Sequence, residues 1–141
     1  MKTTITWDKN VKFTGVTPDG HSVDIDGPPE AGGANEGMRP MELILMGVGA
    51  CSAFDVMSIL QKSRQNVTAC RCEVSATRAD EIPKVFTDIH LHFIVAGPAE
   101  PGLSEKHVAR AIKLSAEKYC SASIMLAKAA NVTHSYEILT D

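Results

Sequence analysis

Cysteines are the residues of this 141-residue chain with the most obvious chemistry, and two of the four lie in segments of helical composition. Cys51 lies in an apolar segment, where a cysteine is usually inert packing, and Asp55 four residues later would disfavour its thiolate. Cys120 would lie at a helix N-terminus if the helical run breaks near Tyr119 and Ser121 caps a new helix, and the helix dipole there would lower its pKa. The residues alone leave reactive and structural interpretations open.

The other two cysteines, with two histidines, have the spacing of metal ligands. Cys70 and Cys72 share one face of an expected strand, and His90 and His92 share one face of the next. The cysteines lie with the apolar side chains, whereas the histidines lie opposite them, so the two pairs would lie on opposite sides of the sheet. We therefore expect core cysteines and solvated histidines, and a metal site is the weaker alternative.

Composition and charge exclude several other classes of protein. No phosphate-binding glycine loop and no serine–histidine–acid spacing is evident. The net charge of −3 lacks the basic footprint of nucleic-acid binding. The first residues contain no apolar stretch typical of a signal peptide. With 44% hydrophobic residues, we expect one domain over residues 1–141, cytoplasmic, with free thiols.

The elements that would position these residues follow from periodicity. Alternating apolar residues predict three short strands within the first 26 residues, with a turn at Pro18-Asp19-Gly20. Residues 27–39 are rich in glycine and proline and predict a loop. Pro40 then begins a helix, and Leu43–Leu60 is apolar nearly all round. Between Glu42 and Asp55 only twelve residues are free of charge, so we expect a central core helix and no membrane span.

The second half alternates again between strands and helices. Ala69–Arg78 and Val85–Ala96 predict an antiparallel hairpin, Ser104 caps a following helix, and Val132–Leu139 predicts a last strand. Val85 is expected on the core face of its strand. The order βββ-α-ββ-α-(α)-β predicts an α+β fold with mostly antiparallel sheets.

Two runs of residues give a resemblance to a known family. Arg39–Ser52, read RPMELILMGVGACS, and Glu117–Ser123, read EKYCSAS, resemble the OsmC/Ohr family of osmotically inducible and organic-hydroperoxide-resistance proteins. The closer similarity is to its YhfA-like branch, through Ser58–Lys62 and Thr133–Glu137. The resemblance covers essentially the whole chain.

The resemblance implies a cytoplasmic, intertwined homodimer with two long central helices and active sites at the subunit interface. In the peroxidase members, a first cysteine attacks the peroxide and a second condenses with the sulfenic acid as a disulfide. A dithiol such as a lipoylated protein then restores both thiols, and no bound cofactor is needed. By position, Cys51 would be peroxidatic and Cys120 resolving.

The sequence departs from the family pattern at the residues that activate the cysteine. Family peroxidases use an arginine from an N-terminal strand, where this chain has only Lys9 and Lys12. The usual glutamate position holds Met41, and the proline that normally follows the second cysteine is a serine. We take Glu42 and Arg39 as candidate supports of the reaction.

We therefore expect a thiol-dependent peroxidase that reduces organic hydroperoxides through Cys51 and Cys120. The alternative is a catalytically weak or inactive dimer of the same fold that binds a small apolar ligand at the interface cleft. Neither interpretation requires nucleic acid or a membrane.

Overall fold

The computed structural model describes residues 1–141, and their contacts fall into two compact units, residues 1–44 and residues 45–141. The expectation of a single domain remains a prediction.

The first unit contains a three-stranded antiparallel meander, ordered β1-β2-β3. The strands are β1 (Thr4–Lys9), β2 (Lys12–Val16) and β3 (Ser22–Ile25). Gly20 adopts a φ of +86° in the turn between β2 and β3, which confirms the predicted turn. The apolar side chains of β1 are exposed, with Ile5 at 56% and Trp7 at 63%. The strands were thus predictable from the sequence, whereas the exposure of the apolar face of β1 was not.

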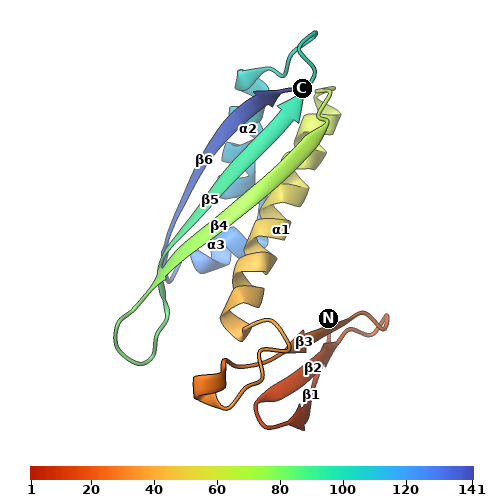
Figure 1. Ribbon diagram of the computed structural model, residues 1–141. Coiled ribbons are helices and arrows are strands. Elements are labelled where there is room, and N and C mark those ends of the chain that lie inside the picture. Colours follow the sequence, from red (N-terminus) through yellow and green to blue (C-terminus); the bar gives the residue numbers. More distant parts are fainter. The chain divides into compact units, whose positions relative to one another are not determined.

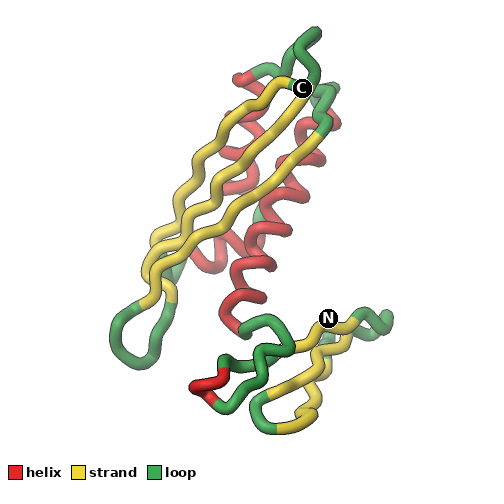
Figure 2. Tube along the Cα trace, in the orientation of Figure 1, coloured by secondary structure: helices red, strands yellow, loops and turns green.

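The loop that follows β3 is organised by a buried carboxylate. The side chain of Asp26 accepts hydrogen bonds from the backbone amides of Gly27, Ala34 and Glu36 at 2.7, 3.0 and 3.0 Å. A short 3-10 turn, Pro29–Ala31, lies within this loop and is the small red segment of Figure 2. The predicted loop is therefore an ordered one.

The long helix α1 (Pro40–Lys62) begins at the predicted proline. It buries Val48, Val56 and Leu60 completely, but Phe54 is 75% exposed and Met46 is 53% exposed. By length and composition alone α1 could cross a membrane, a test that core helices of soluble proteins also pass. The expectation of a fully buried helix is wrong for one chain, because a single sheet covers only one side of it.

The second unit is built on the sheet β4-β5-β6. The strands β4 (Ala69–Arg78) and β5 (Phe86–Gly97) are antiparallel, and β6 (Asn131–Thr140) runs parallel to β5. Figure 1 shows the three helices on one face of this sheet. The core lies between them, with Ile89, Leu91 and Phe93 fully buried. Val85 is 52% exposed, contrary to expectation, because the strand begins one residue later and Phe86 takes the buried position.

The predicted second helical run is interrupted. Helix α2 (Glu105–Leu114), with Ser104 as its N-cap, continues into a π-helical turn, Ser115–Tyr119. The chain becomes extended at Cys120 and then forms the short helix α3 (Ser121–Leu126). The predicted element order and the α+β class are confirmed.

Candidate functional site

Two cysteines from distant parts of the sequence meet in the second unit. The sulfur atoms of Cys51 and Cys120 and a carboxylate oxygen of Asp55 all lie within 4.8 Å of one another. All four cysteines are free thiols. A disulfide requires sulfurs about 2.05 Å apart, so Cys51 and Cys120 are near neighbours that need only a small further approach.

Helix α1 supplies two of the three groups. Cys51 and Asp55 are four residues apart, so they lie on one face of the helix, one turn from each other. Ser52, fully buried beside them, forms a hydrogen bond of 2.9 Å with the hydroxyl of Ser115. This buried hydroxyl pair joins α1 to the π-helical turn and fixes the register between the two segments.

The π-helical turn supplies Cys120. Its backbone amide donates to the carbonyl oxygen of Ser115 at 2.9 Å, an i to i+5 bond that closes the wider turn. Cys120 is itself the N-cap of α3, and its sulfur accepts a hydrogen bond from the amide of Ser123 at 3.3 Å. The prediction that the helical run breaks before a helix N-terminus is confirmed, although the cap is Cys120 rather than Ser121.

The electrostatic part of that prediction is wrong. Burial, with smaller contributions from nearby Cys51 and Asp55, raises the pKa of Cys120 to about 11, although the amide of Ser123 acts in the opposite direction. The side chain is fully buried, so loss of hydration outweighs one hydrogen bond at a helix of six residues. Asp55, which was expected to disfavour the thiolate of Cys51, is one of the groups that raise the pKa of Cys120.

Accessibility differs between the two thiols. Cys120 is fully buried, whereas Cys51 is only partly buried. Part of Cys51 is therefore in contact with solvent, whereas Cys120 is not. This asymmetry matches the division of roles expected for a first, attacking cysteine and a second, internal one.

The predicted supports Arg39 and Glu42 belong to the first unit, where their contacts are local. Arg39 donates to the carbonyl oxygen of Asp26 at 3.0 Å and to the side-chain oxygen of Asn35 at 2.7 Å. Glu42 accepts from the backbone amide of Arg39 at 2.9 Å, the arrangement of a capping box at the start of α1. These contacts secure the loop and the helix start, and their part in chemistry remains a prediction.

The two lysines at the place of the family arginine are also paired locally. Lys12 and Lys9 lie 3.0 and 3.7 Å from the carboxylate of Glu36. The hydrogen bond with Glu36 raises the pKa of Lys12, and the same bond with Lys12 lowers the pKa of Glu36. Lys9 and Glu36 are exposed and Lys12 is partly buried, so the three side chains form an ion-pair cluster at the surface.

The remaining cysteines and the strand histidines lie on opposite faces of the sheet, as predicted. Cys72 is paired across β4 and β5 with buried Phe93, and burial raises its pKa to about 11. His90 and His92 are paired with exposed neighbours and both contact the hydroxyl of Ser135 at 2.7 Å. The four side chains do not form one cluster.

Sequence reasoning missed the serines of the site and the position of Asp55 beside Cys120. Ser115 lies 3.4 Å from the carboxylate of Asp55 while bonding to Ser52. The i, i+4 spacing of Cys51 and Asp55 was readable, but a contact between α1 and residue 115 depends on tertiary packing.

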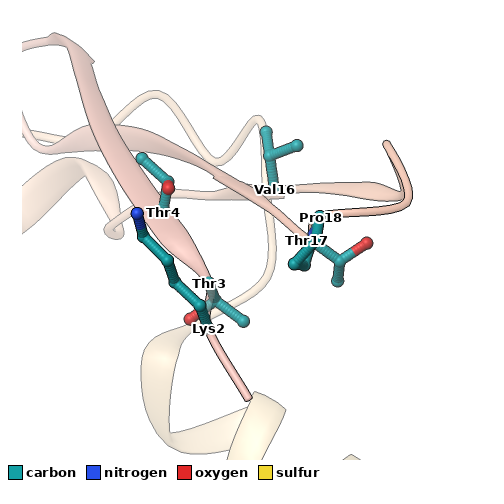
Figure 3. Close-up of a pocket in the computed structure, with 6 residues that line it drawn as sticks. All are labelled: Lys2, Thr3, Thr4, Val16, Thr17 and Pro18. Carbon is teal, nitrogen blue, oxygen red and sulfur yellow. The ribbon is translucent and has the colours of Figure 1, made fainter.

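A hollow in the first unit carries less chemistry than the thiol cluster. This hollow has a volume of about 400 Å³ and lies at the adjoining ends of β1 and β2. In Figure 3 its lining is one lysine among threonines, a valine and a proline: Lys2, Thr3, Thr4, Val16, Thr17 and Pro18. It contains no cysteine, histidine or carboxylate side chain, so the thiol cluster is the better candidate site.

Comparison with known proteins decides the family. The sequence model described as "OsmC-like protein" matches residues 33–135, which include both cysteines of the site. The chain belongs to the OsmC-like family. The protein YhfA of Escherichia coli strain K12 is 45% identical to it over 139 residues, which are 99% of this chain and 98% of YhfA. The predicted resemblance to the YhfA-like branch is therefore confirmed.

Solved structures agree on the OsmC-like fold. A hypothetical protein from Aquifex aeolicus matches with a TM-score of 0.86 and 29% identity, covering 99% of this chain and 96% of that one. An organic hydroperoxide resistance protein, OsmC, from Legionella pneumophila matches with a TM-score of 0.72 and 18% identity, covering 97% of each chain. At 18% identity this second likeness concerns the fold.

Proposed function

We propose that this OsmC-like protein is a thiol-dependent peroxidase that reduces organic hydroperoxides through Cys51 and Cys120. The observation that supports it most is the meeting of these two sulfurs, 69 residues apart in sequence, within 4.8 Å of each other. Structural neighbours described as organic hydroperoxide resistance proteins share the fold.

The first chemical step takes place at the more accessible thiol. The Cys51 thiolate attacks the terminal oxygen of the hydroperoxide, the O–O bond breaks, and the leaving alkoxide takes a proton to become an alcohol. Cys51 is thereby oxidised to a sulfenic acid. The charged group one turn from Cys51 is the carboxylate of Asp55, and no lysine, arginine or histidine forms an ion pair or hydrogen bond with this carboxylate. We therefore expect a slower nucleophile than one paired with a cation.

The second step uses the buried neighbour. The sulfur of Cys120, on losing its proton, attacks the sulfenic sulfur of Cys51; an S–S bond forms, the S–O bond breaks, and water leaves. The short path between the sulfurs favours this condensation over further oxidation. An external dithiol, such as a lipoylated protein, then restores both thiols by exchange and becomes a disulfide itself.

We also propose that the working unit is a homodimer in the cytoplasm. Apolar side chains of the second unit are exposed on α1 and α3, with Phe54 at 75% and Met125 at 66%. Covering such side chains with a second copy would lower the free energy, because apolar surface would be removed from water. A compartment that keeps thiols reduced suits four free cysteines. The substitution Phe54→Asp is expected to shift the mass measured by light scattering towards that of one chain.

The experiment that tests the activity is turnover with an organic hydroperoxide and an excess of dithiol. Cumene hydroperoxide should be consumed catalytically by the wild type and by Cys70→Ser, and not by Cys51→Ser or Cys120→Ser. Consumption by Cys51→Ser equal to that of the wild type would contradict the proposal. Thiols that stay reduced in excess peroxide would favour the alternative, a dimer that binds a small apolar ligand.

A further inference from the structure

The cluster that holds the two thiols also has the composition and size of a metal site. Its three ionisable groups, Cys51, Asp55 and Cys120, are all acids, and Asp55 has no basic partner. Two thiolates and a carboxylate together carry three negative charges, and a divalent cation would reduce this net charge to minus one. Sulfur ligands select thiophilic or borderline cations such as Zn²⁺ over Mg²⁺ or Ca²⁺.

The distances fit a tetrahedral ion. With Zn–S bonds of about 2.3 Å, two sulfurs on one zinc lie about 3.8 Å apart, and a carboxylate oxygen lies slightly closer. The three ligand atoms here are within 4.8 Å of one another without any ion. A contraction of at most about 1 Å between the sulfurs, and slightly more between sulfur and oxygen, would therefore bring all three to bonding distance.

Groups outside the cluster hold two of the ligands. The hydroxyl of Ser115 lies 3.4 Å from Oδ2 of Asp55, and the amide of Ser123 donates to Sγ of Cys120 at 3.3 Å. Outer contacts of this kind orient ligands in metal sites and tune their affinity. Cys51 and Asp55 are further fixed by their spacing of one turn on α1.

We infer that reduced Cys51, Asp55 and Cys120 form a binding site for one thiophilic divalent cation, with Zn²⁺ as the best match. Three protein ligands leave the fourth tetrahedral position for water or another small ligand. This site requires reduced thiols, and it does not depend on the proposed peroxidase activity. A bound cation would occupy both sulfurs, so it would also prevent their joining as a disulfide.

The test is a titration of the reduced full-length protein with Co²⁺ and Zn²⁺ without oxygen or peroxide. Co²⁺ should produce cobalt–thiolate charge-transfer absorption that saturates at one ion per chain, and Zn²⁺ should displace it. Cys51→Ser and Cys120→Ser should each weaken binding by about a hundredfold, and Asp55→Asn by about tenfold, by analogy with the loss of metal-site groups. Cys70→Ser, which removes a thiol outside the cluster, should bind as the wild type does.

A second readout keeps the inference testable where Cys120→Ser, a change at a buried site, fails to fold. Zn²⁺ should raise the melting temperature of the wild type and of Cys70→Ser, because it binds the folded state. It should not raise the melting temperature of Asp55→Asn to the same extent. Wild-type protein without charge-transfer absorption, or with absorption that survives in Cys51→Ser, would overturn the inference. Peroxide turnover measured in metal-free buffer reports on the peroxidase separately.

Discussion

The sulfur of Cys120 accepts a hydrogen bond from the backbone amide of Ser123 at 3.3 Å, yet the pKa of this thiol is raised to about 11. A thiolate at a helix N-terminus is normally favoured by such an amide. Here the side chain is completely buried, and the acidic neighbours Cys51 and Asp55 act in the same direction as burial. The second cysteine is therefore held as a protonated thiol at neutral pH.

This protonation state predicts a pH dependence of disulfide formation. Because only the thiolate attacks, the thiolate fraction of Cys120, and with it the resolving rate, should rise about tenfold per pH unit from pH 7 to about pH 10. The measurement is the rate of loss of the Cys51 sulfenic acid after one equivalent of peroxide. A rate that is flat over this range would show that Cys120 is already ionised at neutral pH.

Removing the charge of Asp55 should lower the pKa of Cys120, because the carboxylate is one of the groups that raise it. In Asp55→Asn we expect the thiolate fraction of Cys120 at pH 8 to rise about threefold or more. The NMR chemical shift of the Cys120 Cβ carbon against pH measures this directly. Asp88→Asn, a change at an exposed position of β5 outside the thiol cluster, is the control and should leave the titration in place.

The buried hydroxyl pair should contribute measurably to stability. Ser115→Ala leaves the hydroxyl of fully buried Ser52 without its 2.9 Å partner, and should cost about 1–3 kcal/mol of unfolding free energy. The double change Ser52→Ala with Ser115→Ala should cost less than the sum of the two single changes. Urea unfolding measures all three, and exposed Ser75→Ala should change stability by no more than about 0.5 kcal/mol.

Additive losses for the two serines would contradict this coupling.

Two glycines of α1 form a matched pair. A Cβ at Gly49 would lie 2.8 Å from Cγ2 of Val74, so Gly49→Ala should force α1 away from the sheet and destabilise by about 1–3 kcal/mol. A Cβ at Gly47 meets nothing within 4 Å, and Gly47→Ala should stabilise by up to about 1 kcal/mol through helix propensity. The melting temperatures of the two variants test these expectations, and equal values would contradict the close approach at Gly49.

The loop that Asp26 organises should be sensitive to acid. Backbone amides, that of Glu36 above all, lower the pKa of Asp26 below its usual 3.8. Its stabilising contribution is therefore complete above pH 3.8 and is lost as the pH falls through the lower, folded-state pKa. Fluorescence of Trp7, the single tryptophan, reports on this unit. Asp26→Asn should remove this part of the acid transition, and an unchanged transition would count against it.

The fold was largely readable from periodicity and turn residues. Pro40 marked the start of α1 and Gly20 marked a turn, because both residues restrict or permit the backbone locally. The exposure of Phe54 could not be predicted. An apolar pattern all round a helix predicts burial, but it does not show whether residues of the same chain or of a second copy bury it.

The site was readable in part. The cysteines were found from their motifs and from the family resemblance, and Asp55 from its i, i+4 spacing. The direction of the Cys120 pKa could not be found this way, because it depends on how burial compares with one amide hydrogen bond. The Ser52–Ser115 contact joins residues 63 apart and exists only in the packed structure.

The central claim is that Cys51 and Cys120 act as a redox pair, and disulfide mapping after oxidation tests it most directly. Reduced, metal-free protein is treated with one equivalent of cumene hydroperoxide, digested, and examined by mass spectrometry. We predict one disulfide per chain, between Cys51 and Cys120, absent from Cys51→Ser and Cys120→Ser, with Cys70 and Cys72 still reduced. A disulfide between Cys70 and Cys72, or four thiols that stay free in excess peroxide, would contradict the account.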